Sequence, residues 1–280
     1  DALATIDRSP SDVTRLILTH THIDHYGLAG RLKRETGCEV WIHEHGDEEL
    51  EILRNPEKVA AQLRETYADH GITGDELEEL TSHEDWRRFV SEVIGADRWV
   101  KGDESVSIGG REWSLVHTPG HALSHVCLFA EDDSILISGD HLLGSVTPHI
   151  DFRRGHGDPL GQFLDSLEKV EKLQPELVLP GHGRPFFDGA ERARATLRHH
   201  ERRLGAVLQV IRRNACTADQ ITEEIFGQSL LNFQKRLALG EALAHIHYLR
   251  LRNEIERIEQ PDGTRLYRKV SRRPVREAEE

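Results

Sequence analysis

The first part of the chain alternates short apolar runs with amphipathic segments. Residues 13–18 (VTRLIL) and 38–42 (CEVWI) are short and rich in branched apolar side chains, which is typical of buried strands. Between them, residues 27–36 place leucines on one side of a predicted helix, and Gly37 follows as its C-terminal cap. This order of strand, helix and strand predicts an α/β fold.

A long acidic stretch separates this start from a second β region. Residues 46–96 repeat apolar side chains at helical spacing, so we expect an inserted set of amphipathic helices there. A further helix is predicted from Pro159 to about residue 173, with Asp158 as its N-cap. Short strand patterns occupy residues 98–100, 104–108, 113–117, 126–130, 134–138 and 176–179.

The last part of the chain is predominantly helical. Thr217 and Gln220 fit a capping box that opens a short helix. A longer helix is predicted over residues 237–253, and residues 255–259 and 265–270 form a predicted hairpin. Helix, turn, helix and hairpin in this order is a winged-helix pattern.

The distribution of charge changes at the same place. Residues 1–190 hold 18 basic and 36 acidic residues, whereas residues 191–280 hold 18 basic and 13 acidic residues. We therefore predict a main domain over residues 1–190, followed by a connecting helix and winged-helix domain over residues 191–280. The acidic main domain disfavours nucleic acid as a partner, because it repels polyanions.

Composition predicts a soluble, cytoplasmic, globular protein. The 280 residues are 37% hydrophobic and 30% charged, and no apolar run approaches the roughly 18 residues that span a bilayer. Cys38, Cys127 and Cys216 stand singly, so we expect free thiols in a reducing compartment. The chain contains no methionine, which suggests a fragment and leaves a removed leader open.

The sequence THTHIDH gathers four candidate metal ligands directly after the first predicted strand. Because residues two apart on a strand point to the same face, His20 and His22 can present two imidazoles to one ion. Asp24 and His25 lie past the strand end, where the chain can turn to offer a second pair to a neighbouring ion. Two ions need more ligands than these four.

Three other predicted strands end just before residues of ligand type. His121 follows a Thr-Pro-Gly turn, Asp140 follows Gly139, and His182 follows a Pro-Gly turn. Ligand sites gather at the carboxyl ends of strands in α/β sheets, so together these positions indicate a two-metal site. His117 and His141 are weaker ligand candidates for which we expect structural roles.

This ordered set of ligands closely resembles the metallo-β-lactamase superfamily, over residues 11–187 apart from the helical insertion. The resemblance implies an αββα sandwich with a dinuclear metal site at one edge of its two sheets. By position, it assigns His20, His22 and His121 to the first ion, Asp24, His25 and His182 to the second, and Asp140 as the bridge between them. Two zinc ions fit these ligands, although iron or manganese would also be accepted.

The chain departs from the family at its start. The family normally has strands and an acidic turn ahead of the HxHxDH segment, and here only 19 residues precede His20. We therefore expect the first sheet to lack its N-terminal strands.

The implied chemistry is hydrolysis by a metal-bridging hydroxide, which attacks an electrophilic carbonyl or phosphorus. Asp24 and Asp140 are the candidate catalytic residues: Asp140 bridges the ions, and Asp24 orients the nucleophile or stabilises developing charge. Tyr26, His149 and Arg153 lie near the ligands in the sequence and are candidate substrate contacts.

Two kinds of substrate remain in question. The tail, with Phe226-Gly227 and residues 242–248 (ALAHIHY), resembles the winged-helix domain of a β-lactamase-like subgroup that includes thioesterase-like enzymes and a single-strand-specific endoribonuclease. We favour hydrolysis of a thioester or ester of a small acyl substrate, as in hydroxyacylglutathione hydrolases, because the main domain is acidic and the insertion can cover an acyl pocket. An endoribonuclease would use the arginine pairs at 202–203, 212–213 and 272–273.

Further alternatives belong to other classes. A mononuclear iron dioxygenase shares the fold, and a DNA-binding regulator could be built on the winged helix. The complete ligand set disfavours the DNA-binding regulator. The expected partner is thus a small acyl molecule, with a homodimer left open and no membrane association.

Overall fold

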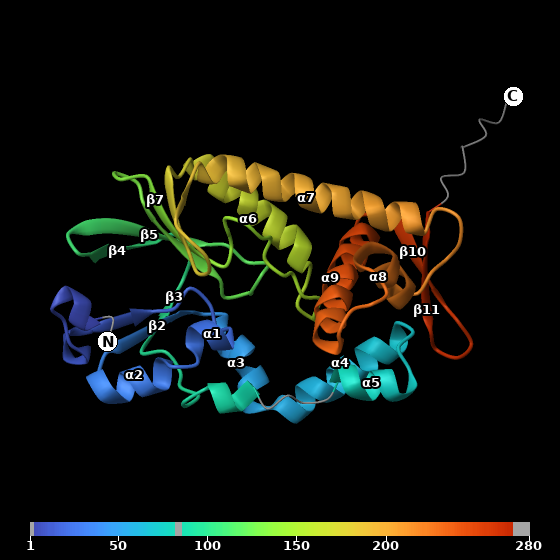
Figure 1. Ribbon diagram of the computed structural model, residues 1–280, viewed down its shortest axis with the longest axis horizontal. Helices are drawn as coiled ribbons and strands as arrows, with labels where there is room; N and C mark the ends of the chain where they lie inside the picture. Colours follow the sequence, from blue (N-terminus) through green and yellow to red (C-terminus); the bar gives the residue numbers. More distant parts are fainter. Residues whose placement is uncertain (1–2, 82–85, 271–280) are drawn as a thin grey trace, which may run out of the picture.

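The computed structural model of the protein describes residues 3–81 and 86–270. Two β-sheets lie face to face, with helices on their outer faces, and a mainly helical tail adjoins one side (Figure 1). This is the mixed α/β sandwich that the sequence predicted. The arginine pair at 272–273 and part of the predicted insertion, residues 82–85, lie outside the described residues.

The first sheet is parallel. Its order is β1 (Arg15–Ile17), β2 (Glu39–His43) and β3 (Arg98–Val100). Helices α1 (Ile23–Tyr26) and α2 (Ala29–Thr36) connect β1 to β2, where the sequence predicted one helix from residue 27. Gly37 ends α2 in a left-handed conformation (φ 72°), as its predicted capping role requires.

The insertion between β2 and β3 is helical, as predicted. It comprises α3 (Gly46–Arg54), α4 (Pro56–Asp69), α5 (Gly74–Thr81) and a short 3₁₀ helix, η3 (Trp86–Phe89). Its first helix lies by the sandwich, whereas α4 and α5 lie below the tail (Figure 1). Tyr67 and Leu80 are buried there in one hydrophobic cluster with Leu243 of the tail. The insertion therefore packs against the tail as well as the sandwich.

The second sheet is larger and mostly antiparallel. Its strands are β4 (Glu104–Ile108), β5 (Arg111–His117), β6 (Val126–Ala130), β7 (Ile135–Gly139), β8 (Leu177–Pro180) and β9 (Phe186–Phe187), in that order. Only β7 and β8 pair in parallel, because α6 (Pro159–Leu173) carries the chain back between them. Asp158 caps α6 as predicted, since its carboxylate accepts a hydrogen bond from the Gly161 amide.

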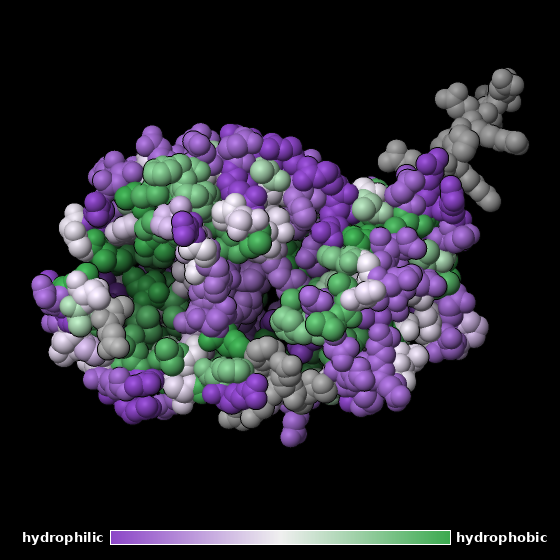
Figure 2. Space-filling model, viewed as in Figure 1, coloured by the Kyte–Doolittle hydropathy of each residue, from purple (hydrophilic) through white to green (hydrophobic). Residues whose placement is uncertain are grey.

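The two sheets bury an apolar layer between them. Trp41 and Val100 of the first sheet belong to one cluster with Trp113, Leu115 and Leu128 of the second. On the left of Figure 2, apolar residues are visible in the hollow between the sheets. Because the sheets stack in this way, loops at their neighbouring edges are brought together.

The tail contains three helices and a hairpin. They are α7 (Gly189–Val210), α8 (Ala218–Phe226), α9 (Asn232–Leu251) and the antiparallel strands β10 (Ile255–Glu259) and β11 (Arg265–Lys269). Helix α9 begins earlier than the predicted residue 237, because the Gln234 side chain accepts a hydrogen bond from the Leu231 amide and caps the preceding turn. Helix α7 runs from above α6 to the tail, and its face in Figure 2 is largely hydrophilic.

Two predictions from composition can be compared with the structure. All three cysteines are free thiols, as expected. Across the described ranges, each helix is too short or too polar to cross a bilayer.

The capping box of α8 can be tested by mutation. The Thr217 hydroxyl accepts a hydrogen bond from the Gln220 amide (3.1 Å), and the Gln220 side chain accepts one from the Thr217 amide (2.9 Å). Thr217→Ala should lower the free energy of unfolding by about 1 kcal/mol, because the Gln220 amide loses its acceptor. Urea denaturation followed by circular dichroism measures this. Thr217→Ser keeps the hydroxyl, so equal losses in both variants would contradict the capping role.

Candidate metal centre

Three histidines from two loops form the first ligand group. His20 and His22 follow β1, His121 follows β5, and one nitrogen from each lies within 4.8 Å of the others. Their rings meet edge to face, with centroids 4.6 Å apart for His20 and His22 and 4.5 Å apart for His22 and His121. His20 is completely buried. The structure therefore brings together the first predicted set.

The backbone positions of His20 and His22 differ from the predicted ones. Strand β1 ends at Ile17, so His20 and His22 lie in the loop beyond it rather than on the strand. His22 nevertheless keeps an extended backbone (φ −62°, ψ 149°) as the N-cap of α1. Asp24 and His25 then belong to the helical turn of α1, which directs them into the second ligand group.

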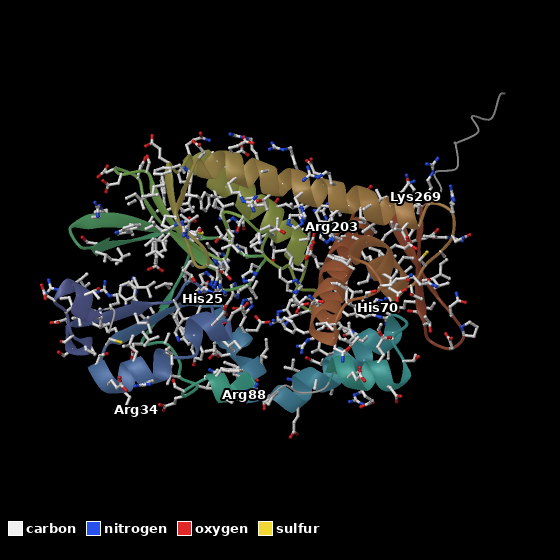
Figure 3. The ribbon with its side chains drawn as sticks, viewed as in Figure 1. His25, Arg34, His70, Arg88, Arg203 and Lys269 are labelled. Carbon is white, nitrogen blue, oxygen red and sulfur yellow. The ribbon has the colours of Figure 1, made fainter. Side chains whose placement is uncertain are left out.

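The second ligand group combines α1 with the loops after β7 and β8. Asp24, His25, Asp140 and His182 each offer an atom within 4.8 Å of the others. Nε2 of His182 lies 3.2 Å from Nε2 of His25 and 3.1 Å from Oδ2 of Asp24. In Figure 3, His25 lies between α1 and the strands of the larger sheet. The second predicted set is thus also brought together.

Asp140 lies between the two groups. Its Oδ2 atom is 3.7 Å from Nε2 of His121 and 3.4 Å from Nε2 of His182. Its Oδ1 atom is 3.4 Å from Nε2 of His25. One carboxylate therefore faces nitrogen ligands of both groups, which is the arrangement expected of a ligand that bridges two ions.

The chemistry of these side chains fits bound cations. Nε2 of His20, Nε2 of His121 and Oδ1 of Asp140 are buried without a hydrogen-bond partner among the described residues. Burial, followed by the neighbouring histidines, holds the pKa of His20 and His22 well below its usual value. Their imidazoles are therefore neutral, and each has a nitrogen lone pair available to a metal ion. Unpartnered buried polar atoms are costly, and coordination would satisfy them.

The other nitrogens of two ligands have partners that orient the rings. Nδ1 of His121 donates to the backbone carbonyl of His149 (2.7 Å), and Nδ1 of His20 lies 3.1 Å from the Thr19 hydroxyl. A histidine that donates from Nδ1 presents a bare Nε2 to a metal. For His121 the backbone contact thus selects the tautomer that can bind.

His125 contacts the backbone of Asp140, although no sequence pattern pointed to it. Its ring is completely buried, and its Nε2 accepts a hydrogen bond from the Asp140 amide (3.1 Å). Its Nδ1 faces the Thr118 hydroxyl at 2.8 Å. Close packing also explains the Pro-Gly-His turn: a Cβ on Gly181 would lie 2.4 Å from Oδ1 of Asp140. Only glycine fits beside the Asp140 carboxylate.

Glu49 joins the two loops that carry the first ligand group. This buried carboxylate on α3 accepts hydrogen bonds from the Thr21 hydroxyl (2.9 Å), the Leu123 amide (2.6 Å), and the Ser124 amide and hydroxyl. Thr21 stands between His20 and His22, and Leu123 follows His121 closely. No local pattern marks Glu49, because its partners are far away in the chain and its neighbours on α3 are acidic surface residues.

The three candidate substrate contacts have different environments in the structure. Tyr26 is completely buried, and its hydroxyl donates to the Ile94 carbonyl (2.7 Å), so the predicted substrate role is wrong and the ring is part of the core. His149 supports His121 through its backbone, and its half-buried side chain lies near Glu241. Arg153 lines a pocket beside His22 and Asp24.

The pocket beside the ligands is mainly apolar and has a volume of about 440 Å³. It is lined by Thr21, His22, Ile23, Asp24, Glu49, Ile52, Leu53, Arg153 and Phe233. Helix α3 of the insertion supplies Ile52 and Leu53, and α9 of the tail supplies Phe233. Arg153 is the one lysine or arginine among these described lining residues. Its guanidinium pairs with Asp151 (3.4 Å) and places a positive charge in the lining of this mainly apolar pocket.

The two weaker histidine candidates lie outside both ligand groups, in agreement with structural roles. His117 stacks on His43, with centroids 4.0 Å apart, and its Nε2 contacts the Leu123 carbonyl. His141 is completely buried against Phe163, and burial lowers its pKa to about 3.

Comparison with known proteins agrees with this geometry. The family model described as "Metallo-beta-lactamase superfamily" matches residues 2–182, which is more than half of the chain. The chain belongs to the metallo-beta-lactamase superfamily. A second model, "Metallo-beta-lactamase-like, C-terminal domain", matches residues 204–270 of this superfamily member. The predicted superfamily is therefore confirmed, and the tail matches a C-terminal domain of metallo-beta-lactamase-like proteins.

Individual relatives cover both parts of this superfamily member. A probable metallo-hydrolase of Bacillus subtilis is 26% identical over 261 residues, which span 89% of this chain and 78% of the relative. The crystal structure of a metallo-beta-lactamase family protein from Thermus thermophilus matches with a TM-score of 0.81 and 28% identity, over 96% of this chain and 84% of that one. A beta-lactamase domain protein from Burkholderia ambifaria matches with a TM-score of 0.82 and 30% identity, over 92% and 75%.

The role of Glu49 can be tested by metal affinity. In Glu49→Gln, one carboxylate oxygen becomes an amide group that cannot accept a hydrogen bond, so the two ligand loops lose part of their connection. We expect the affinity for zinc to fall about 10- to 100-fold, as for other residues that orient metal ligands. Competition with a chromophoric chelator measures this affinity.

Glu48→Gln is the matched control, because Glu48 is the preceding residue on α3 and pairs with His156 (3.7 Å) rather than with the ligand loops. Equal zinc affinity in the two variants would show that Glu49 does not position the ligands.

Proposed function

We propose that the protein is a dinuclear metal-dependent hydrolase that acts on a thioester or ester of a small acyl substrate. The position of Asp140 between the two ligand groups carries the proposal, because its carboxylate faces nitrogen ligands on both sides. When bound, two divalent ions, which we expect to be zinc, would supply Lewis acidity and a water of lowered pKa that can attack a carbonyl carbon.

The ligands divide as the resemblance implies. His20, His22 and His121 would hold the first ion, Asp24, His25 and His182 the second, and Asp140 both. Asp24 is the more exposed of the two aspartates, with 54% of its side chain accessible. It can therefore also accept a hydrogen bond from the attacking water and orient it towards a substrate in the adjoining pocket.

The pocket supports a small acyl substrate. Ile23, Leu53 and Phe233 offer an apolar surface next to the ligands Asp24 and His22, where the acyl group would lie. Burying such a group is favourable by about 25 cal/mol for each Å² of apolar surface removed from water. The acidic main domain and the scarcity of cations among the described lining residues argue against a nucleic acid as the substrate.

A direct comparison of substrates tests the proposal. The zinc-loaded full chain should hydrolyse acyl-glutathione or acyl-CoA thioesters and should not cleave single-stranded RNA. Asp140→Ala should abolish the hydrolysis, because neither ligand group keeps its bridge. Thiol release and RNA gel assays measure the two activities.

Other results of the substrate assays, or of metal analysis, would replace or reject the proposed function. RNA cleavage without thioester hydrolysis would replace the proposal with the endoribonuclease. Thioester hydrolysis that survives in Asp140→Ala would reject the metal-dependent mechanism. A single iron per chain, with consumption of oxygen, would favour the dioxygenase.

Arg153 provides a test of substrate binding. If its guanidinium binds an anionic group of the substrate, Arg153→Ala should raise KM for an acyl-glutathione about tenfold, which corresponds to about 1.4 kcal/mol, and leave kcat nearly unchanged. A neutral aryl ester should show no such change in KM. Arg154→Ala is the control, because Arg154 pairs with Asp69 and lies outside this pocket. A similar rise for the neutral ester would mean that Arg153 shapes the pocket rather than binding the anion.

A further inference from the structure

A second cluster of metal-ligand side chains lies between two helices of the tail. His200 comes from α7, Glu241 and His245 come from α9, and one ligand atom of each lies within 4.8 Å of the others. Both histidines are completely buried. Arg203, one turn beyond His200, lies between α7 and α9 in Figure 3. None of these residues belongs to the two ligand groups described above.

The spacing of the ligand atoms suits a metal ion. Glu241 and His245 are four residues apart on α9, so their side chains lie on the same face, one turn apart. Nδ1 of His200 lies 3.2 Å from Nε2 of His245. The same distance separates Nε2 of His25 from Nε2 of His182 in the superfamily site. Two nitrogens each about 2 Å from one tetrahedral ion would be separated by a similar distance.

The protonation state of His200 and His245 is also compatible with metal binding. Nδ1 of His245 donates to the Glu241 carbonyl (2.7 Å), which leaves a lone pair on the Nε2 that faces His200. Burial lowers the pKa of His245 to about 4, and burial together with His245 lowers that of His200 to about 3. Both rings are therefore neutral near pH 7, the form that binds metals.

The carboxylate of Glu241 is largely buried beside the two histidines. Its side chain is only 13% exposed, and its ion-pair partner within 4 Å among the described residues is His149, whose Nδ1 is 3.8 Å from Oε2. Burial opposes the charged form, but His149 and the more distant Arg203 hold the pKa of the Glu241 carboxyl below its ordinary value, so the carboxylate is charged near pH 7. A charged carboxylate beside two neutral imidazoles gives a set of three side chains that can coordinate a divalent cation.

We propose that His200, Glu241 and His245 bind a divalent transition-metal ion of the zinc type, separate from the catalytic centre. Two nitrogens and one carboxylate oxygen are ligands that zinc favours, with water or another group as the fourth. The ion would join α7 to α9. Through Glu241 and His149 it would also stabilise the loop whose carbonyl orients His121.

Metal content in variants of the full chain tests this site. The parent and each variant are stripped with chelator, reloaded with zinc, desalted, and measured for zinc per folded chain by mass spectrometry. His245→Gln and His200→Gln should each hold about one ion fewer than the parent. His182→Ala, which alters only the catalytic centre, should keep the ion of the tail. After reloading with cobalt, His182→Ala should show visible d–d absorption. The double variant His182→Ala/His245→Gln should absorb less, because it lacks the contribution of the tail site.

The result that overturns the proposal is equal zinc content in the parent, His200→Gln and His245→Gln. The two histidines would then form a hydrogen-bonded structural pair. If a histidine variant does not fold, as judged by circular dichroism, Glu241→Gln decides, because it keeps the shape of the side chain and removes its charge. Glu241→Gln with the zinc content of the parent likewise overturns the site. Because the readout is a difference in bound metal, it does not depend on the substrate of the catalytic centre.

Discussion

The carboxylate of Asp140 lies between two groups of imidazoles, and the surrounding structure is arranged to hold it there. Its amide donates to buried His125, and Gly181 leaves room for one of its oxygens. Its two oxygens face His25, His121 and His182, which come from three different connections of the chain. Ligands this dispersed can meet only if the two sheets pack face to face with their loops at one edge. The packing of the sandwich is therefore what assembles the centre.

Support for the first ligand group comes from outside the sandwich. The Glu49 carboxylate on α3 connects Thr21 with Leu123 and Ser124, so the helical insertion fastens the two ligand loops to each other. The tail adds a second support, because the amide of Phe152 donates to the Gly240 carbonyl and keeps the loop after His149 against α9. Insertion and tail also form the pocket wall, through Leu53 and Phe233. They thus contribute to the candidate site without supplying a member of its two ligand groups.

Local patterns were sufficient for most of the fold. Helix α6 begins and ends where Asp158 and the apolar periodicity predicted, and the strand at 126–130 coincides with β6. Errors arose mainly where contacts with other parts of the chain decide the outcome. Strand β1 is shorter than its apolar run because pairing with β2 ends at Ile17. Tyr26 was assigned wrongly for the same reason, since its partner is Ile94.

The sequence by itself marked the seven candidate ligands that the structure brings together, because their types and spacing after strand ends are local and specific. It also determined the family and the order of elements in the tail. Only the tertiary structure decided which residues support those ligands. Glu49 and His125 act on atoms brought close by packing, and no periodicity marks such pairs. The cluster of His200, Glu241 and His245 has the same origin: two of its members share one face of α9, but the third reaches them only because α7 packs across that helix.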